Sequence, residues 1–205
     1  MPTCATCGER FEVPAHVAQR YPGWTPPDCP ACFRRRSAGA TAAAGEEDLT
    51  VEQVLARYTE GPDTGVFTDG SAEPNPGPGG WGAVYVVDGA IVARDWGHEP
   101  DTTNNRMELM ALLRGLALVP ADTPVTLHTD SKLAVSTVTE WAPAWEARGW
   151  ERKGGPVKNL DLVRELVERL RARPEADIAW LPAHAGLRWN EYADSLSTAW
   201  RRTRL

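Results

Sequence analysis

Four acidic side chains stand in sequence settings that could support chemistry together, namely Asp69, Glu108, Asp130 and Asp194. Asp69 ends a short apolar stretch, VFTD, and a glycine follows it, so we expect a buried strand that delivers one carboxylate into a glycine turn. Four carboxylates that converge on one point repel each other strongly unless cations neutralise them. A pair of divalent metal ions is the natural occupant, which indicates a nuclease-type site.

Each acid also has an ordinary structural interpretation. Glu108 lies three residues after Asn105 and could complete a capping box, and Asp130 could cap the helix that it precedes. Asp69 could form an Asx turn with the glycine that follows it, and Asp194 could face solvent on a terminal helix. These interpretations are the commoner ones for single acids, but the joint pattern favours a shared site.

The four cysteines form two C-x2-C pairs, Cys4 with Cys7 and Cys29 with Cys32, separated by 21 residues. This is close to zinc-ribbon spacing, so we predict a structural Zn²⁺ site with four sulfur ligands in a module spanning residues 1–36. Disulfides or a redox pair are the alternatives, although a redox motif needs only one C-x-x-C. Zinc would supply most of the folding energy of so short a module.

Composition permits one ordinary domain and a small module, since the chain has 205 residues of which 42% are hydrophobic. The total net charge of −6 argues weakly against a nucleic-acid partner, but the distribution of charge along the chain does not. Residues 37–130 hold four Arg against fifteen acids, whereas residues 131–205 hold thirteen Lys or Arg against ten acids. A basic surface can therefore still border the proposed acidic site.

No apolar run approaches the ~18 residues of a membrane span, and the first residues lack a secretory signal pattern, so we expect a cytoplasmic protein. Residues 37–63 are predicted to be a linker with a short helix over 49–58, capped by Thr50 and Gln53. The arginines at 34–36 before it are either solvated or in contact with phosphate.

Residues 64–205 have the pattern of an α/β domain with a mixed sheet and helices on its faces. The expected elements are three antiparallel strands between residues 65 and 99 with a tight turn at Asp88-Gly89, a core helix over 105–119, a strand ending at Asp130 where a helix begins, a helix that Asn159 caps, a strand over 177–183 and a terminal helix. Pro143 should break the helix that follows Asp130 into two pieces.

The motifs TDGSAEPNPGPGGWG, TTNNRMEL, HTDS and WLPAHAGLRWNEYAD, in this order, resemble the successive motifs of type 1 ribonuclease H, the bacterial ribonuclease HI family. The resemblance covers about residues 64–203. It implies a ribonuclease H-like five-stranded mixed sheet flanked by helices, with Asp69 on the central strand and Asp130 at the end of the adjacent fourth strand. It also implies an endoribonuclease that cuts the RNA strand of RNA/DNA hybrids and leaves 5′-phosphate and 3′-hydroxyl ends.

By this resemblance the four acids hold two Mg²⁺ ions, for which Mn²⁺ can substitute, with Asp69 bridging them. The same resemblance gives His184, in the HAG loop, a helper role in proton transfer and product release. The substrate contacts that it implies are Asn75, Asn104 and Asn105 in the minor groove of the hybrid, Gly70 and Ser71 on RNA hydroxyls through their backbone, Thr103 and Asn159 on a DNA phosphate, and Trp141 and Trp145 under the DNA strand.

Some features stay open at this point. Trp141 and Trp145 could instead be helix core, but Pro143 between them and several basic residues nearby favour an exposed basic handle. Lys132 stands where bacterial members commonly have Gln, so no specific contact is transferred to it. The N-terminal module does not resemble the hybrid-binding domain of some family members, and it could add substrate affinity, bind a protein or only stabilise the chain.

We therefore predict an RNA/DNA-hybrid endonuclease, and nothing in the sequence demands a dimer. A catalytically weak or inactive hybrid-binding module is the main alternative, and the presence of all four acids and of His184 counts against it. A structural protein whose acids only cap helices, and a related polynucleotidyl transferase on the same fold, are further alternatives. The HAG and NNRMEL signatures fit ribonuclease H better than a transferase.

Overall fold

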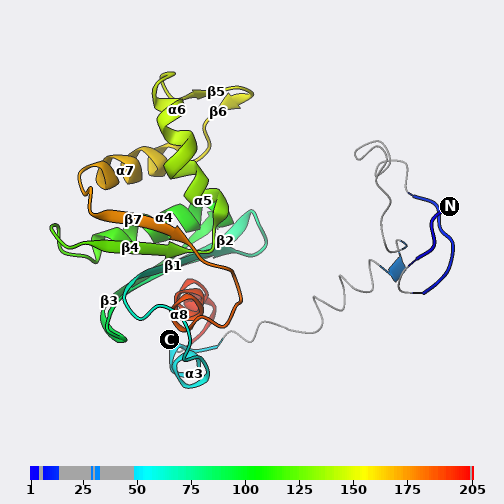
Figure 1. The fold of residues 1–205 in the computed structure, drawn as a ribbon, viewed down its shortest axis with the longest axis horizontal. Coiled ribbons are helices and arrows are strands. Elements are labelled where there is room, and N and C mark those ends of the chain that lie inside the picture. Colours follow the sequence, from blue (N-terminus) through cyan, green and yellow to red (C-terminus); the bar gives the residue numbers. More distant parts are fainter. Residues whose placement is uncertain (5–6, 14–28, 30, 33–48, 204) are drawn as a thin grey trace. The chain divides into compact units, whose positions relative to one another are not determined.

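The computed structural model describes residues 1–4, 7–13, 29, 31–32, 49–203 and 205. The chain forms two compact units, Met1–Glu47 and Asp48–Leu205, and the second carries the sheet and its helices (Figure 1). The arginines at 34–36 and the first part of the predicted linker lie outside the described residues. Among the described residues, no helix has the length and apolar character needed to cross a membrane.

A five-stranded sheet with the order β3-β2-β1-β4-β7 lies at the centre of the second unit. Its strands are β1 (Gly65–Ala72), β2 (Gly77–Val87), β3 (Ala90–Thr102), β4 (Val125–Thr129) and β7 (Ala176–Trp180). The first three pair antiparallel, and β4 pairs parallel with both β1 and β7. The predicted mixed sheet with a central first strand is thus confirmed, and Asp88 and Gly89 make the predicted tight turn with φ of 49° and 74°.

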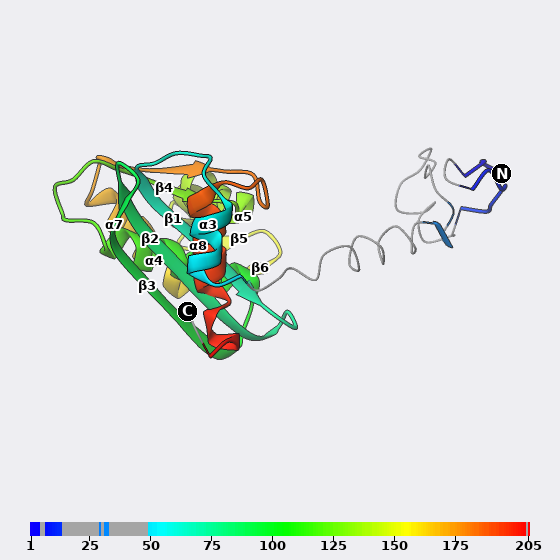
Figure 2. The ribbon, with the colours of Figure 1, turned by 90° about the horizontal axis from the view of Figure 1, so that it is seen from below.

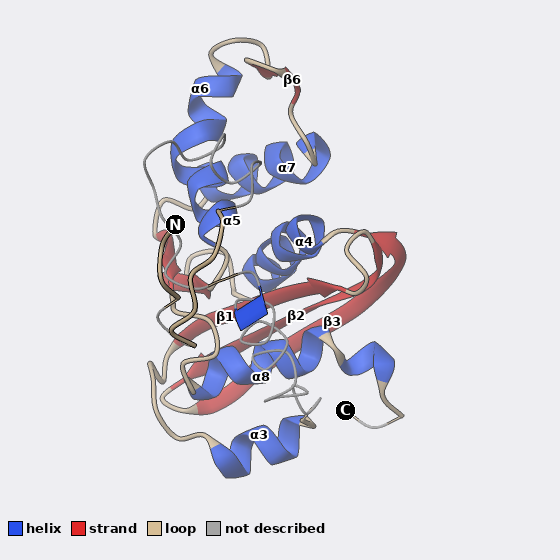
Figure 3. Ribbon diagram, turned by 90° about the vertical axis from the view of Figure 1, so that its right-hand side faces the viewer, coloured by secondary structure: helices blue, strands red, loops and turns tan. Residues whose placement is uncertain are grey.

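Helices cover both faces of this sheet (Figure 3). The remaining elements are α3 (Val51–Arg57), α4 (Asn104–Ala117), α5 (Lys132–Ser136), η1 (Thr137–Trp141), α6 (Ala142–Glu146), the hairpin strands β5 (Glu151–Arg152) and β6 (Gly155–Pro156), α7 (Leu160–Arg171), α8 (Arg188–Ser197) and η2 (Ala199–Arg201). Two cores result, because alternate residues of β1 point to opposite faces. Val66 packs into the core beneath α4 and α7, and Phe67 into the core beneath α8 and α3.

The helix α3 belongs to the second unit, where it lies beside α8 (Figure 2). Its predicted capping box is present, since the Thr50 hydroxyl accepts from the Gln53 amide at 3.3 Å and the Gln53 side chain accepts from the Thr50 amide at 2.8 Å. Val51 and Val54 are buried in the α8 core, which ties this segment to the main sheet.

The predicted glycine turn after Asp69 is wrong, because β1 continues through Gly70 and beyond it. A Cβ atom on Gly70 would lie within the backbone of Met107 and Glu108 in α4. Position 70 therefore needs glycine because α4 packs so closely on β1, and not because the chain turns there. This approach also brings Glu108 next to the middle of β1.

The predicted break at Pro143 is also wrong, since α5, η1 and α6 follow one another without a gap. The η1 segment is one π-helical turn, in which the Ala142 amide donates to the Thr137 carbonyl. Pro143 then sits in the first turn of α6, where its missing N–H and its ring are tolerated. A local change of helical register thus accommodates the proline within a continuous rod.

Candidate active site

Three of the predicted acids converge. Asp69, Glu108 and Asp130 each offer a carboxylate oxygen within 4.8 Å of the other two. Asp69 comes from the middle of β1, Glu108 from α4, which crosses β1, and Asp130 directly follows β4, the parallel neighbour of β1. The site is therefore assembled from three elements that are distant in sequence and adjacent in space.

Helix capping does not explain these acids. The N-cap of α4 is Thr103, whose hydroxyl accepts an amide hydrogen bond of 3.3 Å from three residues further on. The N-cap of α5 is Ser131, which does the same at 3.2 Å. Glu108 and Asp130 are thus free of the capping roles that single-residue reasoning assigns to them.

Electrostatics of the cluster favour a bound cation. Burial raises the pKa of Asp69 well above its usual value, and the charges of Asp194 and Asp130 raise it further. Burial, followed by the charge of Asp69, likewise raises the pKa of Glu108. Within the described part of the chain, the buried Oε2 atom of Glu108 has no hydrogen-bond partner. Such a set of crowded oxygen donors fits Mg²⁺ or Mn²⁺, which prefer carboxylate ligands.

Asp194 lies beside this cluster on α8. It is half-buried, and its charge raises the pKa of both Asp69 and Glu108. It stands outside the group of three acids whose oxygens lie within 4.8 Å of one another. The solvent-facing interpretation of Asp194 therefore does not hold, and its carboxylate borders the cluster.

Two polar residues of α8 that the sequence interpretation missed contact the acids. The Ser197 hydroxyl donates to Oδ2 of Asp69 at 2.5 Å, and Nδ2 of Asn190 donates to Oδ2 of Asp130 at 3.3 Å. Asn190 precedes Asp194 by four residues and Ser197 follows it by three, so helical periodicity puts all three on one face. That spacing was the available signal for both.

Trp180 and Lys132 flank the Asp130 backbone. The indole N–H of Trp180 donates to the Asp130 carbonyl at 3.0 Å, and Nζ of Lys132 lies 4.3 Å from the centroid of the Trp180 ring. The ammonium therefore makes a cation–π contact at this position. Trp180 keeps 42% of its surface exposed at the end of β7.

His184 lies on the turn that joins β7 to α8, apart from the carboxylate cluster. It is exposed and has a φ of 49°. The Gly186 amide in the same turn donates to Glu191 of α8 at 3.0 Å, which fixes the end of the loop. The expected exposure of His184 is confirmed, and its helper role stays a prediction.

Two of the predicted asparagines, Asn75 after β1 and Asn104 at the start of α4, connect these two elements. The side-chain oxygen of Asn75 accepts from the Asn104 amide at 3.3 Å, and that of Asn104 accepts from the Ala72 amide at 2.6 Å. These bonds join the end of β1 and the loop after it to the first turn of α4, next to Thr103. Both asparagines are exposed, so a ligand in solvent can reach them.

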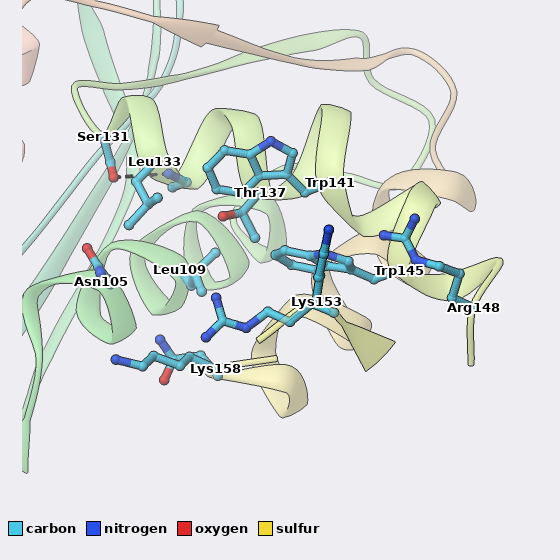
Figure 4. A pocket seen from close by; sticks show the side chains of 13 residues that line it. Asn105, Leu109, Ser131, Leu133, Thr137, Trp141, Trp145, Arg148, Lys153 and Lys158 are labelled. Carbon is cyan, nitrogen blue, oxygen red and sulfur yellow. Dashed lines mark hydrogen bonds between the residues drawn. The ribbon is translucent and has the colours of Figure 1, made fainter. Parts of the chain in front are cut away.

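A cavity of about 470 Å³ is lined by residues of α4, α5, η1, α6 and the segment that follows them (Figure 4). Ser131, which follows Asp130, and Asn105, one turn before Glu108, line it together with both predicted tryptophans. The remaining polar lining comprises Thr137, Asn159 and four basic residues, Arg148, Arg152, Lys153 and Lys158. The cavity thus has a positively charged lining.

Trp141 and Trp145 are 6.0 Å apart between ring centroids and tilted by 46°. Trp141 keeps 39% of its surface exposed, which fits the exposed handle, whereas Trp145 is half-buried and packs against the core beneath α4 and α7, which fits the core interpretation. Asn159 occupies the N-cap of α7 with a φ of 53°, but its side chain makes no capping bond. The predicted side-chain cap is therefore wrong, and Asn159 lines the cavity instead.

The sulfur atoms of the four cysteines form a second cluster, in the first unit, within 4.8 Å of one another. None of these four residues forms a disulfide. The Cys29 amide donates to Sγ of Cys4 at 3.2 Å, and Gly8, with a φ of 74°, closes the turn after Cys7. Hydrogen bonding with Cys7, and then burial, raises the pKa of Cys32 to about 12. Four convergent sulfurs match a closed tetrahedral metal site.

The mixed sheet and the three carboxylates on adjacent elements define the ribonuclease H-like class of α/β proteins. The RNase H family model matches residues 61–201. Ribonuclease HI of Pseudomonas aeruginosa strain PAO1 is 46% identical over 134 residues, which cover 64% of this chain and 88% of that protein. This chain therefore belongs to the ribonuclease H family, as a type 1 enzyme.

Two solved structures are similar to the chain. LC9-RNase H1, described as a type 1 RNase H with the type 2 active-site motif, is 32% identical with a TM-score of 0.54, over 69% of this chain and 74% of that one. LC11-RNase H1, crystallised in complex with an RNA/DNA hybrid, is 25% identical with a TM-score of 0.50, over 65% of this chain and 92% of that one.

Proposed function

We propose that this ribonuclease H hydrolyses the RNA strand of RNA/DNA hybrids as an endonuclease that uses two divalent metal ions. The observation that carries the proposal is the cluster of Asp69, Glu108 and Asp130, whose carboxylate oxygens lie within 4.8 Å of one another. Ser131, which directly follows Asp130, lines a cavity with basic and aromatic walls. The hybrid bound to LC11-RNase H1 supports the same class of substrate.

The metal ligands would be the three clustered acids together with Asp194. Bound Mg²⁺ ions, or Mn²⁺ in their place, would lower the pKa of the attacking water and offset charge on the leaving 3′ oxygen, which gives 5′-phosphate and 3′-hydroxyl products. Burial of Asp69 and Glu108, which raises the pKa of both, also lowers the local dielectric constant, so their carboxylates would attract bound cations more strongly than in water. His184, exposed on its turn, would assist proton transfer to the departing strand.

Strand choice would come from two surfaces on either side of the acids. The rim formed by Asn75, Asn104 and the backbone of Gly70 and Ser71 offers hydrogen-bonding groups to the minor groove and to RNA 2′-hydroxyls. The cavity offers Trp141 and its neighbours to sugars, and basic groups to the phosphates of the DNA strand. A hybrid is the duplex that presents both kinds of strand at once.

A cleavage assay tests this proposal. Purified protein with Mg²⁺ is incubated with an end-labelled RNA/DNA hybrid, and in parallel with RNA/RNA, DNA/DNA and single-stranded RNA. We expect cleavage confined to the RNA of the hybrid, and products that a ligase can rejoin across a DNA splint. Asp130→Asn should fold and bind hybrid but lose nearly all cleavage. Hybrid binding without cleavage by the wild-type protein would refute the proposal.

We also propose that Cys4, Cys7, Cys29 and Cys32 hold one structural Zn²⁺ ion. The support is the convergence of the four sulfurs together with the two C-x2-C pairs. Elemental analysis of the purified full-length chain should give one zinc per molecule, and Cys29→Ser should lose it while hybrid cleavage by the second unit persists. Four thiols that react freely in zinc-replete protein would contradict the assignment.

A further inference from the structure

Ser197 is a buried hydroxyl in contact with the acid cluster. Its side chain is fully buried near the end of α8, and its Oγ atom lies 2.5 Å from Oδ2 of Asp69. The same oxygen is 3.0 Å from the backbone carbonyl of Asp194 and 3.3 Å from Oγ of Ser71. One hydroxyl thus meets one predicted metal ligand directly and the backbone of another.

The Ser197 hydroxyl can donate only one hydrogen bond, so its acceptor has to be identified. A serine hydroxyl has one proton to donate and lone pairs to accept with. The carboxylate of Asp69 is both the strongest acceptor and the nearest one, so the Ser197 proton is directed to it. Ser71 is then the donor to Ser197, and the two serines form a short chain that ends on Asp69. The Asp194 carbonyl is the alternative acceptor within the helix.

Close packing of α8 on the sheet makes this contact geometrically available. A Cβ atom on Gly80 of β2 would lie within the Ser197 backbone carbonyl, and one on Gly82 would lie 2.5 Å from the Ala193 carbonyl. Both positions are glycine, so the helix sits directly on the sheet and Ser197 reaches the neighbouring strand β1. Alternation along β1 turns Asp69 and Ser71 toward the same helix as Phe67.

We propose that Ser197 is a positioning residue for metal binding, whose hydroxyl holds the Asp69 carboxylate in the orientation that the ions require. One turn of α8 thereby supplies both Asp194 and the group that orients Asp69. The proposal rests on the metal-dependent function proposed above. Asp69 stands among like charges, and its favourable contacts are a hydrogen bond with the Gly70 backbone and the Ser197 hydroxyl, which is the side-chain donor that fixes one of its oxygens.

The test compares Ser197→Ala with Ser195→Ala as a matched control. Ser195 is on the same helix, is 2% exposed, and donates to the Leu49 carbonyl at 2.5 Å, away from the acids. Magnesium binding to the free protein is measured by calorimetric titration, and the rise in melting temperature with Mg²⁺ is measured in parallel. Ser197→Ala should weaken Mg²⁺ binding about tenfold, as is usual for a lost partner of a metal ligand, and Ser195→Ala should leave it unchanged.

Steady-state kinetics add a second readout. In Ser197→Ala, kcat should fall at low Mg²⁺ and recover at high Mg²⁺, while KM for the hybrid stays constant. Ser197→Cys keeps a weaker donor of similar volume and should bind Mg²⁺ with intermediate affinity, which also serves if the alanine variant folds poorly. Wild-type Mg²⁺ affinity in both Ser197 variants would overturn the inference. If the wild-type protein binds Mg²⁺ but does not cut the hybrid, the proposed function is refuted and the inference about Ser197 is not.

Discussion

Removing the charge of Asp69 should stabilise the metal-free protein while it abolishes activity. The carboxylate oxygens of Asp69, Glu108 and Asp130 lie within 4.8 Å of one another. Two unit charges at about that separation repel by about 3 kcal/mol at an effective dielectric constant of about 20. Asp69→Asn removes its part of this repulsion and keeps the shape of the side chain.

The gain depends on pH, and its sign follows from linkage. Burial, and then Asp194 and Asp130, raise the folded-state pKa of Asp69 above its ordinary value of 3.8. The folded chain therefore holds a proton that the unfolded chain releases, so wild-type stability falls as pH rises from the ordinary pKa through the raised one. Asparagine has no such dependence. Because protonation relieves part of the repulsion and the Ser197 bond to Asn is weaker, we expect a net gain of about 1–3 kcal/mol at pH 8.

The assay is guanidinium unfolding in EDTA at pH 5 and pH 8, repeated with Mg²⁺. The variant should exceed the wild type at pH 8 and approach it at pH 5, and Mg²⁺ should stabilise only the wild type. Asp122→Asn, an exposed acid in the connection before β4, serves as the control and should change little at either pH. A variant less stable than the wild type in EDTA at pH 8 would show that the acids do not repel as the geometry requires.

Three further predictions concern packing and substrate contact. Gly70→Ala should cost about 1–3 kcal/mol of folding free energy in denaturant titrations, because its Cβ meets the α4 backbone, and an unchanged midpoint would contradict that contact. Trp141→Ala should raise KM for hybrid roughly fivefold or more with little change in melting temperature, since the ring is already 39% exposed; an unaltered KM would exclude it from the substrate path. Asn159→Gly should keep the stability of the fold, because the φ of 53° at this position suits glycine. It should weaken hybrid binding several-fold in titrations without Mg²⁺, and an unchanged affinity would show that the Asn159 amide does not contact a DNA phosphate.

Much of the fold was predictable because its signals are local. The capping box at Thr50 and the Asp88-Gly89 turn depend on a few neighbouring residues, and both are observed. The sheet followed from the alternation of strands and helices along the chain. Gly70 was misinterpreted for the opposite reason, since the atoms that exclude a side chain there belong to α4, far along the chain.

The helix around Pro143 and the role of Asn159 show a second kind of limit. Proline predicts a break when the helix is assumed to keep its α-helical register, and a π-helical turn removes that assumption. Asn159 has a residue type suited to capping, but its left-handed backbone turns the side chain into the cavity. In both cases the residue type left several conformations open, and the surrounding structure selected one.

For the active site, the sequence by itself determined which groups are present and in which order, because carboxylates, cysteine pairs and helix periods are properties of residue type and spacing. Only the tertiary structure decided that Glu108 meets Asp69 and Asp130 within 4.8 Å, that Ser197 donates to Asp69, and that Trp141 stays exposed beside basic groups. The physical reason is that burial, repulsion between charges and hydrogen-bond partners depend on distances between elements, and those distances are set by the packing of helices on the sheet.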